Sequence, residues 1–340
     1  MPNYRPGRAA LMWRPAGDDG TAECLLCARA CRIPPGRTGF CQVRLNHEGE
    51  LRTLNYGFTG ALALDPVEKK PLYHFRPGTL TFSVGAPGCN LDCQGCQNHG
   101  LSRPGPDFAP VEAPADLAAR LGQAAQAQGA DSWSFTYSEP TVFFEYAQDL
   151  AAEAAKAGRP TIWVTNGEMS PQVLKSLDVA AMNIDLKGFT EDFYRQVTGG
   201  RLAPVLDNIE TALSRGVWVE VTTLLIPGLN DDPATLKRLA AWLAGLGRDV
   251  PWHVSRFFPR RRQSSLPPTP LKSLQLAREI GLSEGLNHVY LGNAPGFSDT
   301  LCPGCGHALV ARDGYRLGLD LLSGRGVCPA CGRPTAGRWT

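Results

Sequence analysis

Three closely spaced cysteines are the residues of this chain that most clearly indicate chemistry. Cys89, Cys93 and Cys96 lie in the run VGAPGCNLDCQGCQNHG as a C-x3-C-x2-C triplet. Three thiolates can bind three irons of a 4Fe–4S cluster and leave the fourth iron without a protein ligand, whereas a cluster that only passes electrons normally has four cysteine ligands. The triplet therefore predicts an open iron where a substrate or cofactor binds. The alternative is a zinc site with His99 as fourth ligand.

The C-terminal segment carries a second kind of cysteine pattern. It reads CPGCG, then 21 residues, then CPACG. Two such knuckles are typical of a four-thiolate structural zinc site, and the glycine after each lets the backbone turn around the metal. We therefore predict zinc at Cys302, Cys305, Cys328 and Cys331.

The first fifty residues hold a third group of four cysteines, in CLLCARAC followed by GRTGFC. Zinc and a second iron–sulfur cluster are both compatible with this spacing, and we favour zinc. The proposed ligands are Cys24, Cys27, Cys31 and Cys41.

The stretch between the cysteine groups must position this chemistry, and it alternates between strand-like and amphipathic helix-like runs. Such alternation predicts a parallel sheet with right-handed crossovers. Six or seven β/α units are too few for a closed eight-fold barrel, so we predict an α/β fold, a partial (open) TIM-like parallel β/α barrel over residues 80–296. Cys-rich segments flank it at 1–79 and 297–340. The strand-like runs are Leu80–Val84, Ser132–Tyr137, Pro160–Thr165, Ala180–Leu186, Val217–Ile226, Pro251–Phe257 and His288–Leu291, and the helix-like runs include Ala115–Gln128, Thr141–Ala157, Pro233–Leu246 and Leu271–Leu282.

Polar residues at the ends of these strands are candidates for the site. Asp185 and Lys187 alternate and so point to the same side of a strand that is otherwise apolar. Lys187 can hold a ligand carboxylate and Asp185 can hold Lys187 or a small cation, with a structural salt bridge as the alternative. Asn166 precedes Gly167 at another strand end, where glycine permits close backbone approach to a ligand.

Several runs together resemble one family closely. They are DPVEKKPLYHFRPG, GCNLDCQGCQN, YSEPT, TNG, NIDLKG, LLIPGLND, PWHVSRFFP and VYLGNAPG, together with the cysteine runs at both ends. The chain resembles radical S-adenosylmethionine (radical SAM) enzymes, and more narrowly the radical SAM member of the AmmeMemoRadiSam system, a relative of the pyruvate formate-lyase activating enzymes. The resemblance covers essentially the whole chain.

The resemblance implies a function as well as a fold. The open iron would bind S-adenosylmethionine, and reductive cleavage would give methionine and a 5′-deoxyadenosyl radical that abstracts hydrogen from a substrate. It places Ser138 and Glu139 near the methionine ammonium and His253 near the cofactor carboxylate or adenosine. The chain departs from the family pattern at Ser138, where glycine is common, and at His99, where an aromatic residue is expected. The polar run Glu68, Lys69, Lys70, Tyr73 and His74 would lie at the mouth of the site.

The substrate is the open part of this hypothesis. An activase-like reaction on a protein is our preferred expectation. The alternatives are radical modification of a small molecule, or a non-catalytic zinc-stapled binding module. The expected partners are an electron donor such as flavodoxin and, by resemblance, Memo-like and AMMECR-like proteins.

Composition restricts the remaining choices. The chain has 340 residues, of which 43% are hydrophobic and 19% charged, with a formal net charge of +2. This charge gives no reason to expect a nucleic acid or a membrane as partner. The sequence shows neither a signal peptide nor an apolar run long enough to span a membrane. Eleven cysteines in metal-like clusters then indicate a reducing compartment, and we expect a cytoplasmic enzyme.

Overall fold

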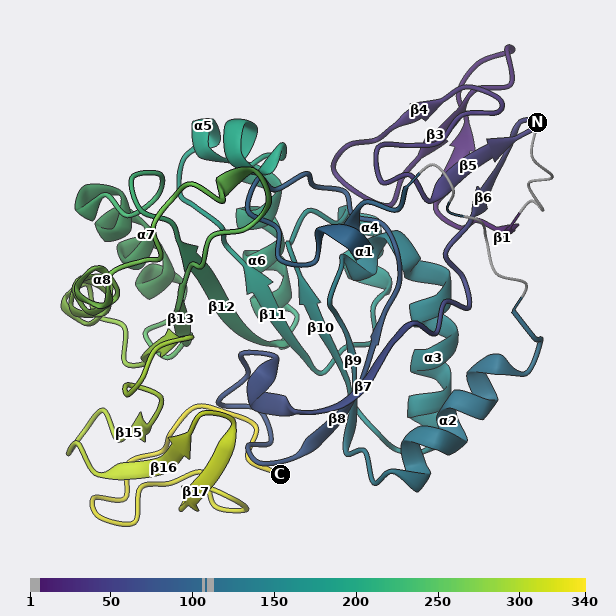
Figure 1. The fold of residues 1–340 in the computed structure, drawn as a ribbon. Helices are drawn as coiled ribbons and strands as arrows, with labels where there is room; N and C mark the ends of the chain where they lie inside the picture. The colour runs from purple at the N-terminus through teal and green to yellow at the C-terminus, as the bar shows by residue number, and fades with distance from the viewer. Residues whose placement is uncertain (1–6, 106–107, 109–112) are drawn as a thin grey trace.

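An eight-stranded sheet forms the centre of the molecule (Figure 1). The computed structural model describes residues 7–105, 108 and 113–340. The strand order is β14-β13-β12-β11-β10-β9-β8-β7, so the sheet runs in chain order from one edge to the other. All neighbours from β8 to β14 pair in parallel, and β7 pairs antiparallel with β8. The strands are β7 Ala61–Pro66, β8 Leu80–Gly85, β9 Ser132–Phe135, β10 Thr161–Thr165, β11 Ala181–Asp185, β12 Trp218–Leu225, β13 Trp252–Arg256 and β14 Val289–Gly292.

This sheet confirms the predicted partial barrel. Each of the seven strand-like runs is a parallel strand, and every boundary lies within two residues of the predicted one. The strands are rich in β-branched and aromatic residues, as in Thr161-Ile-Trp-Val-Thr165, and nearly all their side chains are buried because parallel sheets are covered on both faces. The sequence did not predict β7, which lies inside the first Cys-rich segment and extends the sheet by one strand.

Helices connect the strands and surround the sheet (Figure 1). Two of them begin with residues that favour helix starts: Ser170 accepts a hydrogen bond from Val173 N, Asp232 accepts one from Thr235 N, and a proline follows each. The described helices are α1 His99–Ser102, α2 Leu117–Ala127, α3 Phe144–Lys156, α4 Pro171–Ser176, α5 Glu191–Phe193, α6 Ala203–Ser214, α7 Pro233–Leu246 and α8 Leu271–Ser283, with short turns of other helix types at Val67–Lys69, Pro140–Phe143, Tyr194–Thr198 and Arg261–Gln263.

The N-terminal segment folds into two small antiparallel sheets, β1-β6-β5 and β2-β3-β4. A buried ion pair, 2.7 Å between Arg44 and Glu145, fastens β5 to α3 of the barrel. Ala28 N donates to Glu168 O, and Ser170 N donates to Leu26 O. These two hydrogen bonds join the cysteine-rich turn to the loop after β10. The strands are β1 Arg8–Ala9, β2 Trp13–Pro15, β3 Ala22–Cys24, β4 Arg32–Ile33, β5 Arg44–His47 and β6 Glu50–Thr53.

The C-terminal segment is a three-stranded antiparallel sheet, β15 Thr300–Leu301, β16 Ala308–Asp313 and β17 Arg316–Asp320, followed by a knuckle loop. It has its own small core of Leu309, Val310, Leu322 and Trp339. His74 ties it to the barrel: its Nδ1 lies 2.7 Å from Ala336 O and its carbonyl accepts from Arg338 N. No helix in the described part of the chain is long and apolar enough to cross a membrane.

Candidate functional site

A cavity of about 630 Å³ lies where the carboxyl ends of the parallel strands meet. Loops at these strand ends can carry chemistry because parallel strands bring their carboxyl ends to one edge. Every residue predicted for the cluster and cofactor lines this cavity: Cys89, Cys93, Cys96, Ser138, Glu139, Asn166, Asp185, Lys187 and His253. The structure thus brings these side chains together from five strands, β8, β9, β10, β11 and β13, while their individual roles stay predictions.

The cysteine triplet lies on the loop that follows β8. Leu91 N donates to Cys89 Sγ over 3.4 Å, and Asn166 Nδ2 lies 3.8 Å from the same sulfur. Such donors stabilise a metal-bound thiolate. Burial raises the pKa of Cys93 to about 11, and the charge of Lys187 acts in the opposite direction. Loading with metal must therefore displace the thiol protons.

The triplet does not fit the alternative of a single zinc ion. Within the described residues, one group of three or more metal-binding side chains has its ligand atoms within 4.8 Å of one another, and it is at the C-terminus. His99 is exposed on α1 rather than turned to the cysteines as a fourth ligand. Thiolates on separate irons are spread more widely than thiolates on one ion, so the triplet fits a cluster.

Glu139 occupies the position between β9 and the next helical turn. Its Oε1 accepts from Thr141 N, Thr141 Oγ1 and Thr165 Oγ1, at 3.1, 2.6 and 2.7 Å, and its Oε2 accepts from Asn166 N at 2.8 Å. Burial raises the pKa of Glu139, while these donors oppose the shift. Glu139 therefore has a structural role as the cap of the next turn and also lines the cavity.

Ser138 and Tyr137 shape the same turn. Ser138 Oγ donates to Ala86 O over 2.5 Å, so its hydroxyl is already engaged by the protein. Tyr137 has a φ of 71°, a left-handed conformation that is costly for a bulky residue. Its hydroxyl donates to Asp65 across 2.5 Å. The strained backbone is held by these contacts at the edge of the cavity.

Asp185 and Lys187 form the expected pair at the end of β11, 2.8 Å apart and both only partly exposed. Burial favours the neutral amine, but the charges of Asp185 and Cys93 raise the pKa of Lys187 above its usual value. A charged amine paired with Asp185 at the edge of the cavity is suited to hold a carboxylate.

His253 is more deeply embedded than the sequence indicates. Its Nε2 lies 2.6 Å from Glu220 Oε2, and its ring packs against Tyr73 and Tyr290. Glu220 is fully buried and also accepts from the backbone amides of Tyr73 and His74 and from the indole of Trp218. Burial raises the pKa of Glu220, but these donors, His253 foremost, bring it down to about 2.

The polar run before β8 reaches the cavity as well. Glu68, Lys69, Lys70 and Tyr73 line it, whereas His74 is buried behind it. Both lysines pair with Asp65, at 2.8 and 2.7 Å, and with Tyr137 these contacts hold the pKa of Asp65 well below its usual value against the effect of burial. The two lysines belong to the polar run predicted for the mouth of the site, whereas Asp65, which begins the run DPVEKK, was not predicted as part of it.

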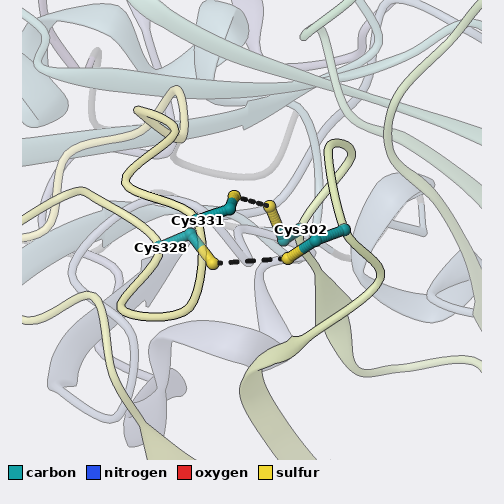
Figure 2. Close-up of side chains that lie close together, drawn as sticks. Cys302, Cys328 and Cys331 are labelled. Carbon is teal, nitrogen blue, oxygen red and sulfur yellow. Dashed lines mark hydrogen bonds between the residues drawn. The ribbon is translucent and has the colours of Figure 1, made fainter.

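The C-terminal cysteines converge as a metal site should. Cys302 and Cys331 lie 3.6 Å apart and Cys305 and Cys328 3.7 Å apart, and Figure 2 shows the sulfurs of Cys302, Cys328 and Cys331 turned toward one another. Burial raises the pKa of Cys302, but N–H bonds from Gly304 and Cys305 and the neighbouring thiols lower it to about 7. Four sulfurs at this separation suit one tetrahedral ion.

The N-terminal cysteines are neighbours but do not converge in this way. No three of the four have their sulfurs within 4.8 Å of one another in the described structure. Burial raises the pKa of the Cys24 and Cys41 thiols, that of Cys41 to about 11, while the positive charge of Arg44 lowers it again.

Comparison with known proteins identifies the family. Residues 83–240 match the Radical SAM superfamily. An uncharacterized protein of Methanocaldococcus jannaschii is 39% identical over 323 residues, 93% of this chain and 95% of that protein. A probable GTP 3',8-cyclase of Aeropyrum pernix is 31% identical over 260 residues, 68% of this chain and 70% of that protein. The chain belongs to the radical SAM superfamily.

A solved structure supports the fold. Streptococcus suis SuiB bound to S-adenosylmethionine has a TM-score of 0.50 and 14% identity, over 67% of this chain and 53% of that one. At this identity the similarity is one of fold alone. The cofactors that the family implies, a 4Fe–4S cluster and S-adenosylmethionine, fit the residues that line the cavity.

Proposed function

We propose that this protein cleaves S-adenosylmethionine reductively and uses the resulting radical on a protein or peptide substrate, in the manner of a glycyl radical activating enzyme. The observation that supports this most is the single cavity that contains the cysteine triplet together with Glu139, Asn166, Asp185 and Lys187. The cluster and S-adenosylmethionine supply a 5′-deoxyadenosyl radical when bound. The protein supplies orientation and excludes water and oxygen.

Within this proposal the residues that line the cavity have different roles. Cys89, Cys93 and Cys96 hold the cluster. Lys187 binds the cofactor carboxylate and Asp185 orients Lys187 through their 2.8 Å contact. Asn166, whose Nδ2 lies 3.8 Å from Cys89 Sγ, stabilises the loaded loop.

Two features support a large substrate. The sheet ends at two unjoined edge strands, β7 and β14, so the barrel is open at its side. Tyr315, half-exposed on the turn between β16 and β17, lines the cavity from the C-terminal segment. The C-terminal segment therefore forms part of the opening of the cavity, and an extended peptide lying across that opening would contact it.

A second candidate is cyclisation of GTP, which the similarity to the Aeropyrum pernix protein favours. A triphosphate needs cations to bind it. Among the described residues that line the cavity, the lysines are Lys69, Lys70 and Lys187, each paired with an aspartate, and there is no arginine. This charge distribution makes GTP the less suitable substrate.

The first experiment tests the cleavage itself. The anaerobically loaded protein, reduced with dithionite, should convert S-adenosylmethionine slowly to 5′-deoxyadenosine and methionine. Lys187→Gln should weaken cofactor binding by roughly 1–3 kcal/mol, the value of a lost charged hydrogen bond. Lys156→Gln, an exposed lysine on α3, is the matched control. If the cluster-loaded protein yields no deoxyadenosine, the proposal is wrong.

The second experiment identifies the substrate class. The reduced enzyme receives S-adenosylmethionine with an extract of cells grown in deuterated medium, divided by size into macromolecules and small molecules. A macromolecular substrate transfers deuterium to 5′-deoxyadenosine from the large fraction. Deuterium arriving from the small fraction alone, or from deuterated GTP, would replace the activase proposal with the small-molecule alternative. A partner from the AmmeMemoRadiSam system or a flavodoxin-like donor is a further proposal that reconstitution with each purified protein tests.

A further inference from the structure

The N-terminal cysteines form a group that the proposed function does not use. Cys24 ends β3 and Cys41 lies just before β5, and both are buried, while Cys27 and Cys31 are half-buried on the turn between them. Cys24 N donates to Cys31 O over 2.9 Å, which closes that turn. Cys27 therefore lies within a closed turn that begins at one buried cysteine, Cys24, and ends at Cys31.

The spacing of the sulfurs distinguishes this group from the C-terminal one. Four sulfurs about 2.3 Å from one zinc ion lie at most about 4.6 Å apart. The C-terminal sulfurs satisfy a 4.8 Å limit, but no three of the N-terminal sulfurs do. The Cys89, Cys93 and Cys96 triplet also exceeds that limit. In this respect the N-terminal group resembles the triplet rather than the C-terminal group.

Arg44 supplies a second observation. It lies three residues after Cys41, its side chain is 1% exposed, and its Nε has no hydrogen-bond partner among the described residues. Its other nitrogens are engaged by Glu145 and Leu11 O. A buried donor without a partner is costly, and a cluster sulfide or thiolate would accept from it. Hydrogen bonds to sulfur of this kind are one means by which proteins set a cluster's reduction potential.

The group also packs against the loop of the catalytic triplet. Arg29, between Cys27 and Cys31, donates its Nε to Asn90 O and a second nitrogen to Gly199 O. A methyl group added at Gly88, next to Cys89, would lie 3.1 Å from Cys41 O. The backbones of the two cysteine groups are therefore in contact, without a domain or solvent layer between them.

We propose that Cys24, Cys27, Cys31 and Cys41 bind a second 4Fe–4S cluster, which passes single electrons to the catalytic one. This departs from the zinc that the sequence favours, because spacing along the chain does not reveal spacing between sulfurs. A cluster with four cysteine ligands has no open iron and suits electron transfer. One electron enters it from a one-electron reductant, and it is oxidised again when the electron moves to the cluster of the triplet.

Metal content of the unmodified protein gives the first test. After anaerobic purification with iron, sulfide and zinc all supplied, the proposal predicts about eight irons and one zinc per chain, since each cube holds four irons. About four irons and two zincs would overturn it. This measurement needs no substitution, so it does not depend on the folding of a variant.

Variants then locate the iron. The triple variant Cys89→Ala, Cys93→Ala, Cys96→Ala, in the full chain, should keep about four irons and show the electron paramagnetic resonance signal of a reduced cluster after dithionite. Adding Cys27→Ser should remove that iron. Loss of all iron in the triple variant, with an unchanged circular dichroism spectrum, would show that the N-terminal cysteines bind no second cluster. Neither count depends on S-adenosylmethionine cleavage, so this proposal and the proposed function can fail separately.

The electron-passing role has its own measurement. The Cys27→Ser variant, with the catalytic triplet intact, is mixed with reduced methyl viologen, and reduction of its remaining cluster is followed by absorbance. The proposal predicts slower reduction than in the unmodified protein. Equal rates would show that electrons enter the catalytic cluster directly.

Discussion

Glu220→Gln is the substitution for which the structure gives the most definite expectation. The carboxylate is 0% exposed and receives four hydrogen bonds, two on each oxygen. His74 N and Trp218 Nε1 donate to Oε1, while Tyr73 N and His253 Nε2 meet Oε2. An amide offers only one acceptor oxygen. Whichever way it turns, its NH₂ group faces at least one backbone N–H that then has no partner.

The cost can be worked out from these contacts. If the NH₂ group replaces Oε2, His253 can accept from it by changing tautomer, and the Tyr73 N–H is left unsatisfied. A buried unsatisfied donor costs about 1–3 kcal/mol, and the surviving bonds lose roughly half their strength without the charge. We expect Glu220→Gln to lower stability by about 2–4 kcal/mol, or the melting temperature by roughly 5 °C or more.

The pH dependence of this difference has a defined sign. Because the folded pKa of Glu220 is lowered to about 2, its stabilisation is complete above the unfolded pKa near 4.3 and is lost only as the pH falls from there toward 2. The difference between the two proteins should therefore be constant across the neutral range, roughly pH 6 to 8, which lies well above the unfolded pKa of glutamate.

Anaerobic thermal melts at matched metal content measure the effect, with exposed Glu210→Gln on α6 as the control, which should change stability by less than about 0.5 kcal/mol. A variant that melts with the control would refute the account of Glu220. A difference that varies across the neutral pH range would also contradict it, because Glu220 is fully ionised there.

Three further outcomes are expected. Cys93→Ala should abolish the absorbance of the catalytic cluster and leave the C-terminal metal bound, as metal analysis would show. Gly167→Ala should lower the melting temperature strongly, because φ at this residue is +76° and the added methyl would lie 2.9 Å from both Ile184 and Val205. The control is Gly158→Ala, where φ is +65° and the space is open, so that only backbone strain of about 1–2 kcal/mol is expected. A chelator that removes the C-terminal metal should make that segment the first site of proteolysis while the iron absorbance persists.

The barrel and the residues at its edge could be predicted because they depend on local pattern. Strand and helix periods, and polar residues such as Glu139 and Lys187 at strand ends, are visible in short windows of sequence. Parallel pairing then brings those ends to one edge. The edge strand β7 was missed because Ala61-Leu-Ala-Leu-Asp-Pro66 is short and ends in proline, a pattern that reads as a turn when its partner β8 is unknown.

The buried partners of the site could not be predicted, because they meet across the chain. Glu220 joins His253 to the amides of residues 73 and 74, nearly 150 positions earlier. Asp65 meets Tyr137 over a separation of 72 residues. Of these partners, only the indole of Trp218, two residues before Glu220, lies in the same strand as its carboxylate.

The three cysteine groups also show that sequence spacing alone does not give the distances between sulfurs. Sequence spacing gives the number of thiolates and their order, and that was enough to predict an open iron at the triplet and a closed four-thiolate site at the C-terminus. The identity of a metal depends on the distances between sulfurs, which are set by turns and by neighbours such as Arg44 and the loop at Gly88. Two groups of four cysteines therefore look alike in the sequence and differ in the fold: one converges within 4.8 Å, and the other is spread beside the catalytic loop.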